Sequence, residues 1–143
     1  MHTEGWFAPE TVEEAREQYE SVGPAAQTVV REVARAMSFD RDEYADRVSS
    51  DVVETARDSL FASLLEVHVG THEEYASWRE AYDGEVIEHG SDSVDNVAWH
   101  AGPENVAVAA TFQSKPDAAV GTLRRQAFGT IYRELFEQAS SEE

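Results

Sequence analysis

The sequence predicts an α+β fold, in which a helical N-terminal half precedes a small mixed four-stranded sheet packed by a long C-terminal helix. Three observations predict it. Residues 1–65 repeat apolar side chains with a helical period, residues 66–112 contain strand patterns on either side of one helix, and residues 117–138 return to the helical period. We therefore expect a single domain over 1–143, with a helical part at 1–65 and a mixed β/α part at 66–139.

Four helices are expected in the N-terminal half. Thr11 with Glu14, and Asp40 with Glu43, have the spacing of capping boxes at two of the helix starts. The expected ranges are 9–22, 24–38, 40–48 and about 50–65. Each helix has one apolar stripe that we expect to face the core, which in the second helix comprises Ala26, Val29, Val30, Val33 and Met37.

Four strands are expected in the second half. Residues 66–70 and 85–90 alternate polar and apolar side chains, and a helix that opens at Thr71 separates them. A strand, a helix and a strand in that order imply a right-handed crossover and a parallel pair. Residues 97–100 and 106–112 flank a short turn and predict an antiparallel hairpin.

The charge of the chain indicates the solvent in which it works. The net charge is −18, from 29 acidic and 11 basic residues, and Lys115 is the only lysine. A folded surface of about 7,300 Å² would carry one excess negative charge per roughly 400 Å². Such charges repel at about 0.01 M salt, where the Debye length is about 30 Å, and barely interact at about 1 M, where it is about 3 Å. The composition favours adaptation to molar salt over an ordinary acidic protein, which would carry more lysine.

Composition and motifs also exclude several classes of function. The chain has no cysteine, so it has no disulfide, thiolate nucleophile or cysteine-ligated metal site. It has no apolar run of about 18 residues and no signal-peptide pattern at its start, so we expect a cytoplasmic protein without a membrane partner. P-loop, dinucleotide-binding and nucleophile-elbow motifs are absent. We therefore predict no cofactor and no catalytic residue, and an enzyme is the less favoured class.

The stretch 105–133 departs from the acidic average. It holds one acid and four bases, a net charge of +3, which leaves −21 for the rest of the chain. Arg124 and Arg125 within it could hold an anionic ligand or phosphate, since arginine binds such groups through paired hydrogen bonds. The alternative is that both arginines pair with acids of this chain and that the stretch is buried.

The C-terminal helix also offers a candidate interface. Gly121 and Gly129 lie eight residues apart on nearly the same face, and each costs a helix interior roughly 1 kcal/mol relative to alanine. That cost would be offset by close packing of another element against the glycines. With Phe128 beside them, they form a candidate seam of a homodimer.

The histidines are weak candidates for a site. His68 and His72 have a spacing of four, but a strand and a turn are expected there rather than one helix, so we predict no metal site. Surface or capping histidines are the commoner case. The alternative function is a small enzyme or anionic-ligand-binding protein, whose pocket at the strand ends would use His68, His100 and Asp95 with Arg124 or Arg125.

The helices of 24–66 also suggest a helix-turn-helix core followed by a wing-like strand. Residues 40–66 hold eight acids and three arginines, a net charge of −5, so the second helix would present carboxylates to DNA phosphates. A winged-helix-like regulator is thus a weaker alternative, and a nucleic-acid partner is not expected.

Three segments resemble an uncharacterised haloarchaeal protein family, a domain of unknown function: 5–10 (GWFAPE), 93–101 (SVDNVAWHA) and 118–129 (AAVGTLRRQAFG). The resemblance extends over nearly the whole chain. It implies a cytoplasm of high salt, and it implies no activity, ligand or catalytic residue. We predict a salt-adapted, non-enzymatic binding or assembly module that forms a homodimer, with an unknown protein partner as the open alternative.

Overall fold

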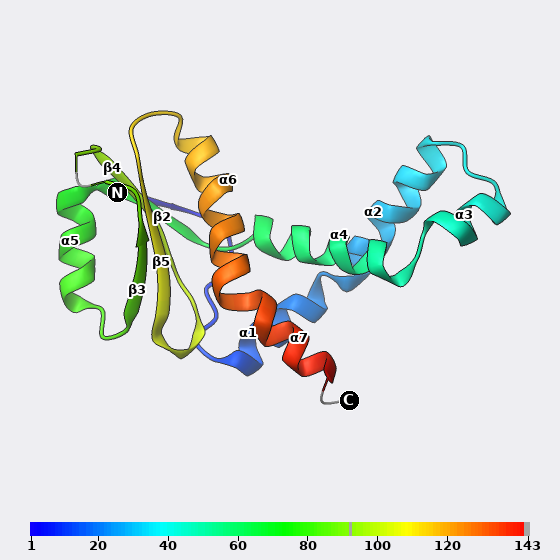
Figure 1. The fold of residues 1–143 in the computed structure, drawn as a ribbon, viewed down its shortest axis with the longest axis horizontal. Helices are drawn as coiled ribbons and strands as arrows, with labels where there is room; N and C mark the ends of the chain where they lie inside the picture. Colours follow the sequence, from blue (N-terminus) through cyan, green and yellow to red (C-terminus); the bar gives the residue numbers. More distant parts are fainter. Residues whose placement is uncertain (92, 142–143) are drawn as a thin grey trace. The chain divides into compact units, whose positions relative to one another are not determined.

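The computed structural model describes residues 1–91 and 93–141, and it divides the chain into two compact units. One unit comprises Met1–Arg16 and the chain from Ala62 onward, and the other comprises Glu17–Phe61. Each unit is described by itself. The α+β class predicted from the sequence is confirmed (Figure 1).

The predicted helices of the N-terminal half are present, and their starts are capped by the expected side chains. The Glu14 backbone N–H donates to Thr11 Oγ1 (3.1 Å), and the Glu43 backbone N–H donates to Asp40 Oδ1 (2.8 Å). The helices are α1 (Val12–Ser21), α2 (Gly23–Ala36), α3 (Arg41–Arg47) and α4 (Ser50–Ser63).

The helical unit has its own buried contacts. The Tyr19 ring meets the Phe61 ring edge-on, with 5.7 Å between centroids, and its hydroxyl donates to Asp58 Oδ1 (2.6 Å). The Arg57 guanidinium lies over the Tyr19 ring, 5.2 Å from its centroid. Burial, and then the Asp58 carboxylate, raise the pKa of Tyr19 well above its usual value, so its hydroxyl remains a hydrogen-bond donor.

The second unit is built on a mixed sheet of five strands in the order β1-β2-β4-β5-β3. The first three pairings in this order are antiparallel, and β5 pairs with β3 in parallel. The strands are β1 (His2–Glu4), β2 (Val67–Thr71), β3 (Glu85–His89), β4 (Asn96–Ala101) and β5 (Val106–Phe112).

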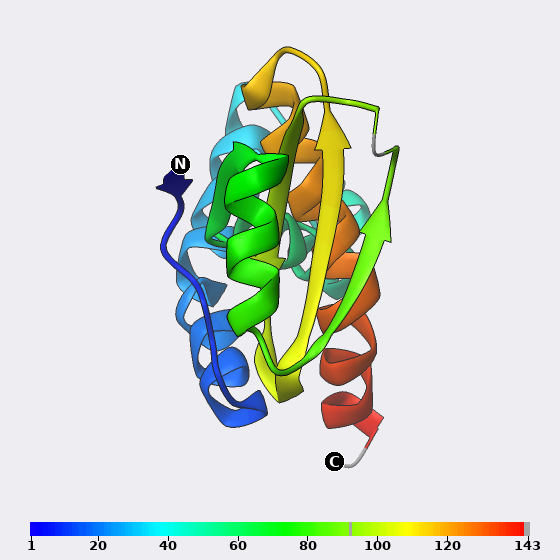
Figure 2. The ribbon, with the colours of Figure 1, turned by 90° about the vertical axis from the view of Figure 1, so that its left-hand side faces the viewer.

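Helices cover both faces of this sheet. Figures 1 and 2 show α5 (His72–Ala81) on one face and α6 (Pro116–Ala127) on the other. Successive residues of a strand point to opposite faces. Trp99 therefore packs beneath α5, against Tyr75, while His100 faces the C-terminal helices and bonds to Tyr132. The helix α5 opens with the predicted capping box, in which Thr71 and Glu74 bond to each other's backbone N–H groups.

Three details of the prediction were wrong. The sheet has five strands, because His2–Glu4 also pairs, although its polar sequence carries no strand pattern. The strands β2 and β3 are not neighbours, since β4 and β5 lie between them, and the parallel pair is β3 with β5. The long C-terminal helix is interrupted: α6 leads into a π-helical turn at Phe128–Tyr132, which leads into α7 (Arg133–Ser141).

Candidate functional site

A cleft of about 550 Å³ lies on the α5 face of the sheet. The helix packs on β2 and β4, and the cleft opens beside it over β5 and β3. Small side chains of β5, including Ala109, form the floor and leave the space unfilled. The polar residues around it are His72, Tyr75, Arg79 and Glu80 of α5, Glu88 and His89 of β3, and Thr111 of β5.

Tyr75 lines this cleft and interacts electrostatically with two of its charged residues. It is buried, and its hydroxyl makes no hydrogen bond to any residue in the described part of the chain. Burial, and then the nearby Glu88 carboxylate, raise the pKa of Tyr75 to about 12, and the Arg79 guanidinium opposes them. The phenol is therefore a protonated donor that is close to one carboxylate and one guanidinium.

One rim of the cleft is held in place by His72. Its Nε2 donates to the backbone carbonyl of Val94, in the segment that enters β4. This hydrogen bond ties the first turn of α5 to the start of that strand and fixes the orientation of the imidazole. In the neutral ring Nδ1 is then an acceptor.

An aromatic cluster supports the cleft from beneath α5. The His68 ring stacks on Trp99 with 5.4 Å between centroids, and the Tyr75 ring lies 5.2 Å from Trp99 on the same face. Trp78 continues the cluster along the helix and stacks on Tyr75. Burial lowers the pKa of His68, against the opposing effect of the Glu66 carboxylate 3.4 Å away. His68 thus belongs to the aromatic core and does not line the cleft.

His100 lies on the opposite face of the sheet, where it is fully buried. Its Nδ1–H donates to the backbone carbonyl of Glu66 (2.6 Å), and Nε2 accepts from the hydroxyl of Tyr132 (2.6 Å). The π-helical turn positions that tyrosine. Burial lowers the pKa of His100 to about 4, so the ring is neutral and both of its nitrogens are paired.

The remaining residues of the expected pocket are dispersed. Arg124 donates through Nε to the backbone carbonyl of Leu65 (2.9 Å), whereas Arg125 is exposed and donates to Thr122 (3.3 Å). Asp95 is exposed ahead of β4. The structure therefore does not bring His68, His100, Asp95 and the two arginines into one pocket, because strand alternation separates the histidines and Arg124 binds backbone.

The expected dimer seam on the C-terminal helix has open space at its two glycines and a buried phenylalanine. A Cβ on Gly121 would meet no atom within 4 Å, and one on Gly129 would come no closer than 3.9 Å, to Arg133. No other element of the described chain therefore packs closely against either glycine. Phe128 is only 5% exposed, and its ring contacts Phe136 and lies beneath Arg133. Gly121, Thr122 and Arg125 are exposed on α6 and Gly129 is exposed in the π-helical turn, whereas the Phe128 ring is buried.

A second surface, an apolar groove of about 450 Å³, lies in the helical unit. We call it the α2–α4 groove. Val29, Val33 and Met37 recur every four residues along α2 and line one side, and Val52 of α4 lines the other. These residues were expected to face the core, yet Val33 is 53% exposed and Met37 is 60% exposed. Alanines and Val30, one position further round the helix, occupy the buried face instead.

Within the described part of the chain, no group of three or more histidines and carboxylates is placed to hold a metal ion. No described helix has the length and apolarity needed to cross a bilayer.

Comparison with known proteins places the chain in a family. No curated protein and no solved structure matches it. A family model described as a family of unknown function, DUF5809, matches residues 6–133, which is most of the chain. This agrees with the resemblance to a domain of unknown function drawn from its sequence segments. The chain therefore belongs to the DUF5809 family, whose function is unknown.

Proposed function

We propose that the chain is a non-enzymatic binding and assembly module of a high-salt cytoplasm, and that it forms a homodimer through the α2–α4 groove. The observation that carries this proposal is the gathering of exposed apolar side chains. Val29, Val33, Met37 and Val52 all line this one groove, and they are among the few large apolar residues exposed in the described chain. Contiguous apolar patches on soluble proteins mark interaction sites.

A second copy of the chain suits this groove because the stripe is self-complementary. Val29, Val33 and Met37 form a line along one helix, and two such lines can pack antiparallel about a twofold axis. The charged residue that lines the groove, Arg47, already lies over the Phe39 ring, 5.8 Å from its centroid. The seam of the dimer would therefore be apolar, as the cores of homodimer interfaces are.

Size and charge set the expected affinity. Eleven residues line the groove, about half of the roughly 20–30 that each partner contributes to a standard interface. The groove alone therefore supports a dissociation constant on the order of micromolar. Two chains that each carry −18 repel one another at low salt, so we expect the dimer to weaken when KCl is diluted.

The decisive variant is Val33→Glu, at the middle of the stripe. A charge buried in an apolar seam costs several kcal/mol, so the variant should remain monomeric. Light scattering in about 2 M KCl should give 15.9 kDa for the variant and twice that for the wild type. The circular dichroism spectrum should not change, because Val33 is exposed in the single chain.

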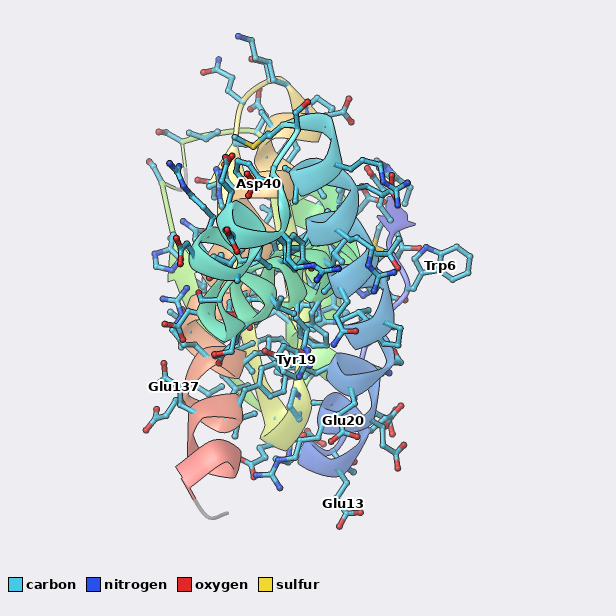
Figure 3. The ribbon with its side chains drawn as sticks, turned by 90° about the vertical axis from the view of Figure 1, so that its right-hand side faces the viewer. Trp6, Glu13, Tyr19, Glu20, Asp40 and Glu137 are labelled. Atoms are coloured by element: carbon cyan, nitrogen blue, oxygen red, sulfur yellow. The ribbon has the colours of Figure 1, made fainter. Side chains whose placement is uncertain are left out.

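Two matched controls identify the surface involved. Trp6→Ser removes an apolar ring that is 81% exposed and lies outside the groove, and Figure 3 shows this ring projecting from the chain. It should leave the dimer intact. Gly129→Arg tests the seam first expected on the C-terminal helix, and it too should leave the mass unchanged. A dimer abolished by Gly129→Arg but not by Val33→Glu, or a monomeric wild type at micromolar concentration, contradicts the proposal.

A further inference from the structure

The cleft beside α5 has the dimensions of a small-molecule site. Its volume of about 550 Å³ falls within the range of roughly 300–1,000 Å³ that is usual for ligand pockets. Its floor is apolar, formed by the side chains of Val97 of β4 and Ala109 of β5. The rim carries charge from two elements, because α5 supplies Arg79 and β3 supplies Glu88.

These charges have no counter-charge of their own. Within the part of the chain that the structure describes, neither Arg79 nor Glu88 forms an ion pair. Beneath them lies the buried hydroxyl of Tyr75, which has no hydrogen-bond partner there either. Buried polar groups in folded proteins are almost always paired, and a ligand bound in the cleft would offer this hydroxyl an acceptor besides the Glu88 carboxylate near it.

The arrangement of charge selects among ligands. A simple anion attracted to Arg79 would also meet the carboxylates of Glu80 and Glu88, and a simple cation attracted to those carboxylates would meet Arg79. A zwitterion satisfies both signs at once. The apolar floor provides space for a hydrocarbon group between them.

We propose that the cleft binds a small amino-carboxylate zwitterion, an α-amino acid with an apolar side chain, whose carboxylate pairs with Arg79 and whose ammonium group pairs with Glu88. The side chain would lie on the floor formed by Ala109 and Val97. Tyr75 acts as a positioning residue, because its hydroxyl is a donor available to Glu88 or to the bound carboxylate. The site lies entirely in the sheet-containing unit, and neither it nor its failure bears on the α2–α4 groove.

The first test uses L-leucine and L-phenylalanine as probes on the full-length chain. Amide chemical shifts should move in α5, β3 and β5 and remain fixed elsewhere, with a dissociation constant on the order of 0.1–1 mM. N-acetyl-L-leucine lacks the ammonium group and L-leucinamide lacks the carboxylate, so each should bind at least tenfold more weakly. The proposal is overturned if neither amino acid moves these shifts at about ten times that concentration, or if the two derivatives bind as well as leucine.

The second test removes the two charges one at a time. Arg79→Gln should weaken leucine binding at least tenfold and should abolish the preference for leucine over L-leucinamide. Glu88→Gln should weaken it similarly and abolish the preference over N-acetyl-L-leucine. Arg125→Gln, at an exposed arginine on α6, is the matched control and should bind leucine as the wild type does. If Arg125→Gln weakens binding as much as Arg79→Gln, the assignment is wrong.

The third test separates the positioning role of Tyr75 from a structural one. Tyr75→Phe should weaken leucine binding several-fold, while the thermal midpoint of the unliganded chain stays the same or rises, because a buried unpaired hydroxyl has been removed. Tyr82→Phe is the matched change, since that hydroxyl is also buried and unpaired in the described chain but lies outside the cleft. It should leave affinity unchanged. Equal effects of the two variants on affinity contradict the assignment.

Discussion

Lowering the pH from 7 to 4 is expected to remove about 3 kcal/mol of the free energy of unfolding through His100 alone. Burial lowers the pKa of His100 from its usual 6.5 to about 4 in the folded chain, so the unfolded chain binds the proton first. The stabilisation is therefore complete above about pH 6.5. It is lost progressively as the pH falls toward 4, and it does not change further below that.

The groups around His100 explain why it resists protonation. Nδ1–H donates to the Glu66 carbonyl, and Nε2 accepts from Tyr132, so a second proton would have to displace the Tyr132 O–H bond. Burial is the largest cause of the lowered pKa of His100, His68 and Arg124 lower it further, and the hydrogen bond to the Glu66 carbonyl opposes them. Burial raises the pKa of Tyr132 far above its usual value, so its hydroxyl stays a donor at every pH considered.

Urea unfolding at intervals between pH 7 and pH 4 measures the effect. His100→Leu should lose roughly 2–5 kcal/mol at pH 7, because the Glu66 carbonyl and the Tyr132 hydroxyl each lose their hydrogen bond to the imidazole. Its stability should then fall less steeply with pH than that of the wild type. The double variant His100→Leu/Tyr132→Phe should recover part of the loss and keep the shallow slope.

His89→Leu provides the control, because His89 is exposed on β3. It should retain the wild-type pH dependence. Some slope will remain in His100→Leu, since burial also lowers the pKa of His68. Identical slopes in the wild type and His100→Leu would show that folding does not lower the pKa of His100, contrary to the expectation.

The elements that follow from local chemistry were predictable from the sequence. Asp40 and Thr71 cap helices where their spacing to Glu43 and Glu74 predicted, because those hydrogen bonds form within one turn. The hairpin of β4 and β5 was equally predictable. The π-helical turn at Phe128–Tyr132 was not, because its sequence continues the apolar period of the helix around it.

The candidate site was predicted less well than the fold, because it depends on tertiary contacts that the sequence pattern does not show. His100 was expected in a pocket because it ends a strand, but β4 is buried on both faces, and the run Val-Ala-Trp preceding the histidine is itself the signal of a doubly covered strand. The apolar stripe of α2 was read as core, although its width exceeds what one neighbouring helix can cover. Arg79 and Glu88 could not be predicted as a site from the sequence, because only the tertiary fold brings α5 and β3 to one cleft.

The second large effect concerns salt. Diluting KCl from about 2 M to about 0.01 M is expected to lower the free energy of unfolding by several kcal/mol, because the chain carries a net charge of −18. Two like charges 20 Å apart repel by about 0.2 kcal/mol in water, and eighteen excess charges form many such pairs. Molar salt removes nearly all of this repulsion, whereas dilute salt preserves about half of it at that distance.

Thermal unfolding followed by circular dichroism across a KCl series tests this expectation, and the midpoint should rise steeply with salt and then level off. Asp46→Asn and Glu85→Gln, at exposed positions in the two units, reduce the excess charge without removing a described ion pair or hydrogen bond. Combined, they should raise the midpoint at low salt and leave it unchanged at high salt. The opposite pattern, a gain at high salt only, would indicate that KCl acts by strengthening apolar burial rather than by screening. A midpoint independent of KCl would mean that the acidic surface is no adaptation to salt.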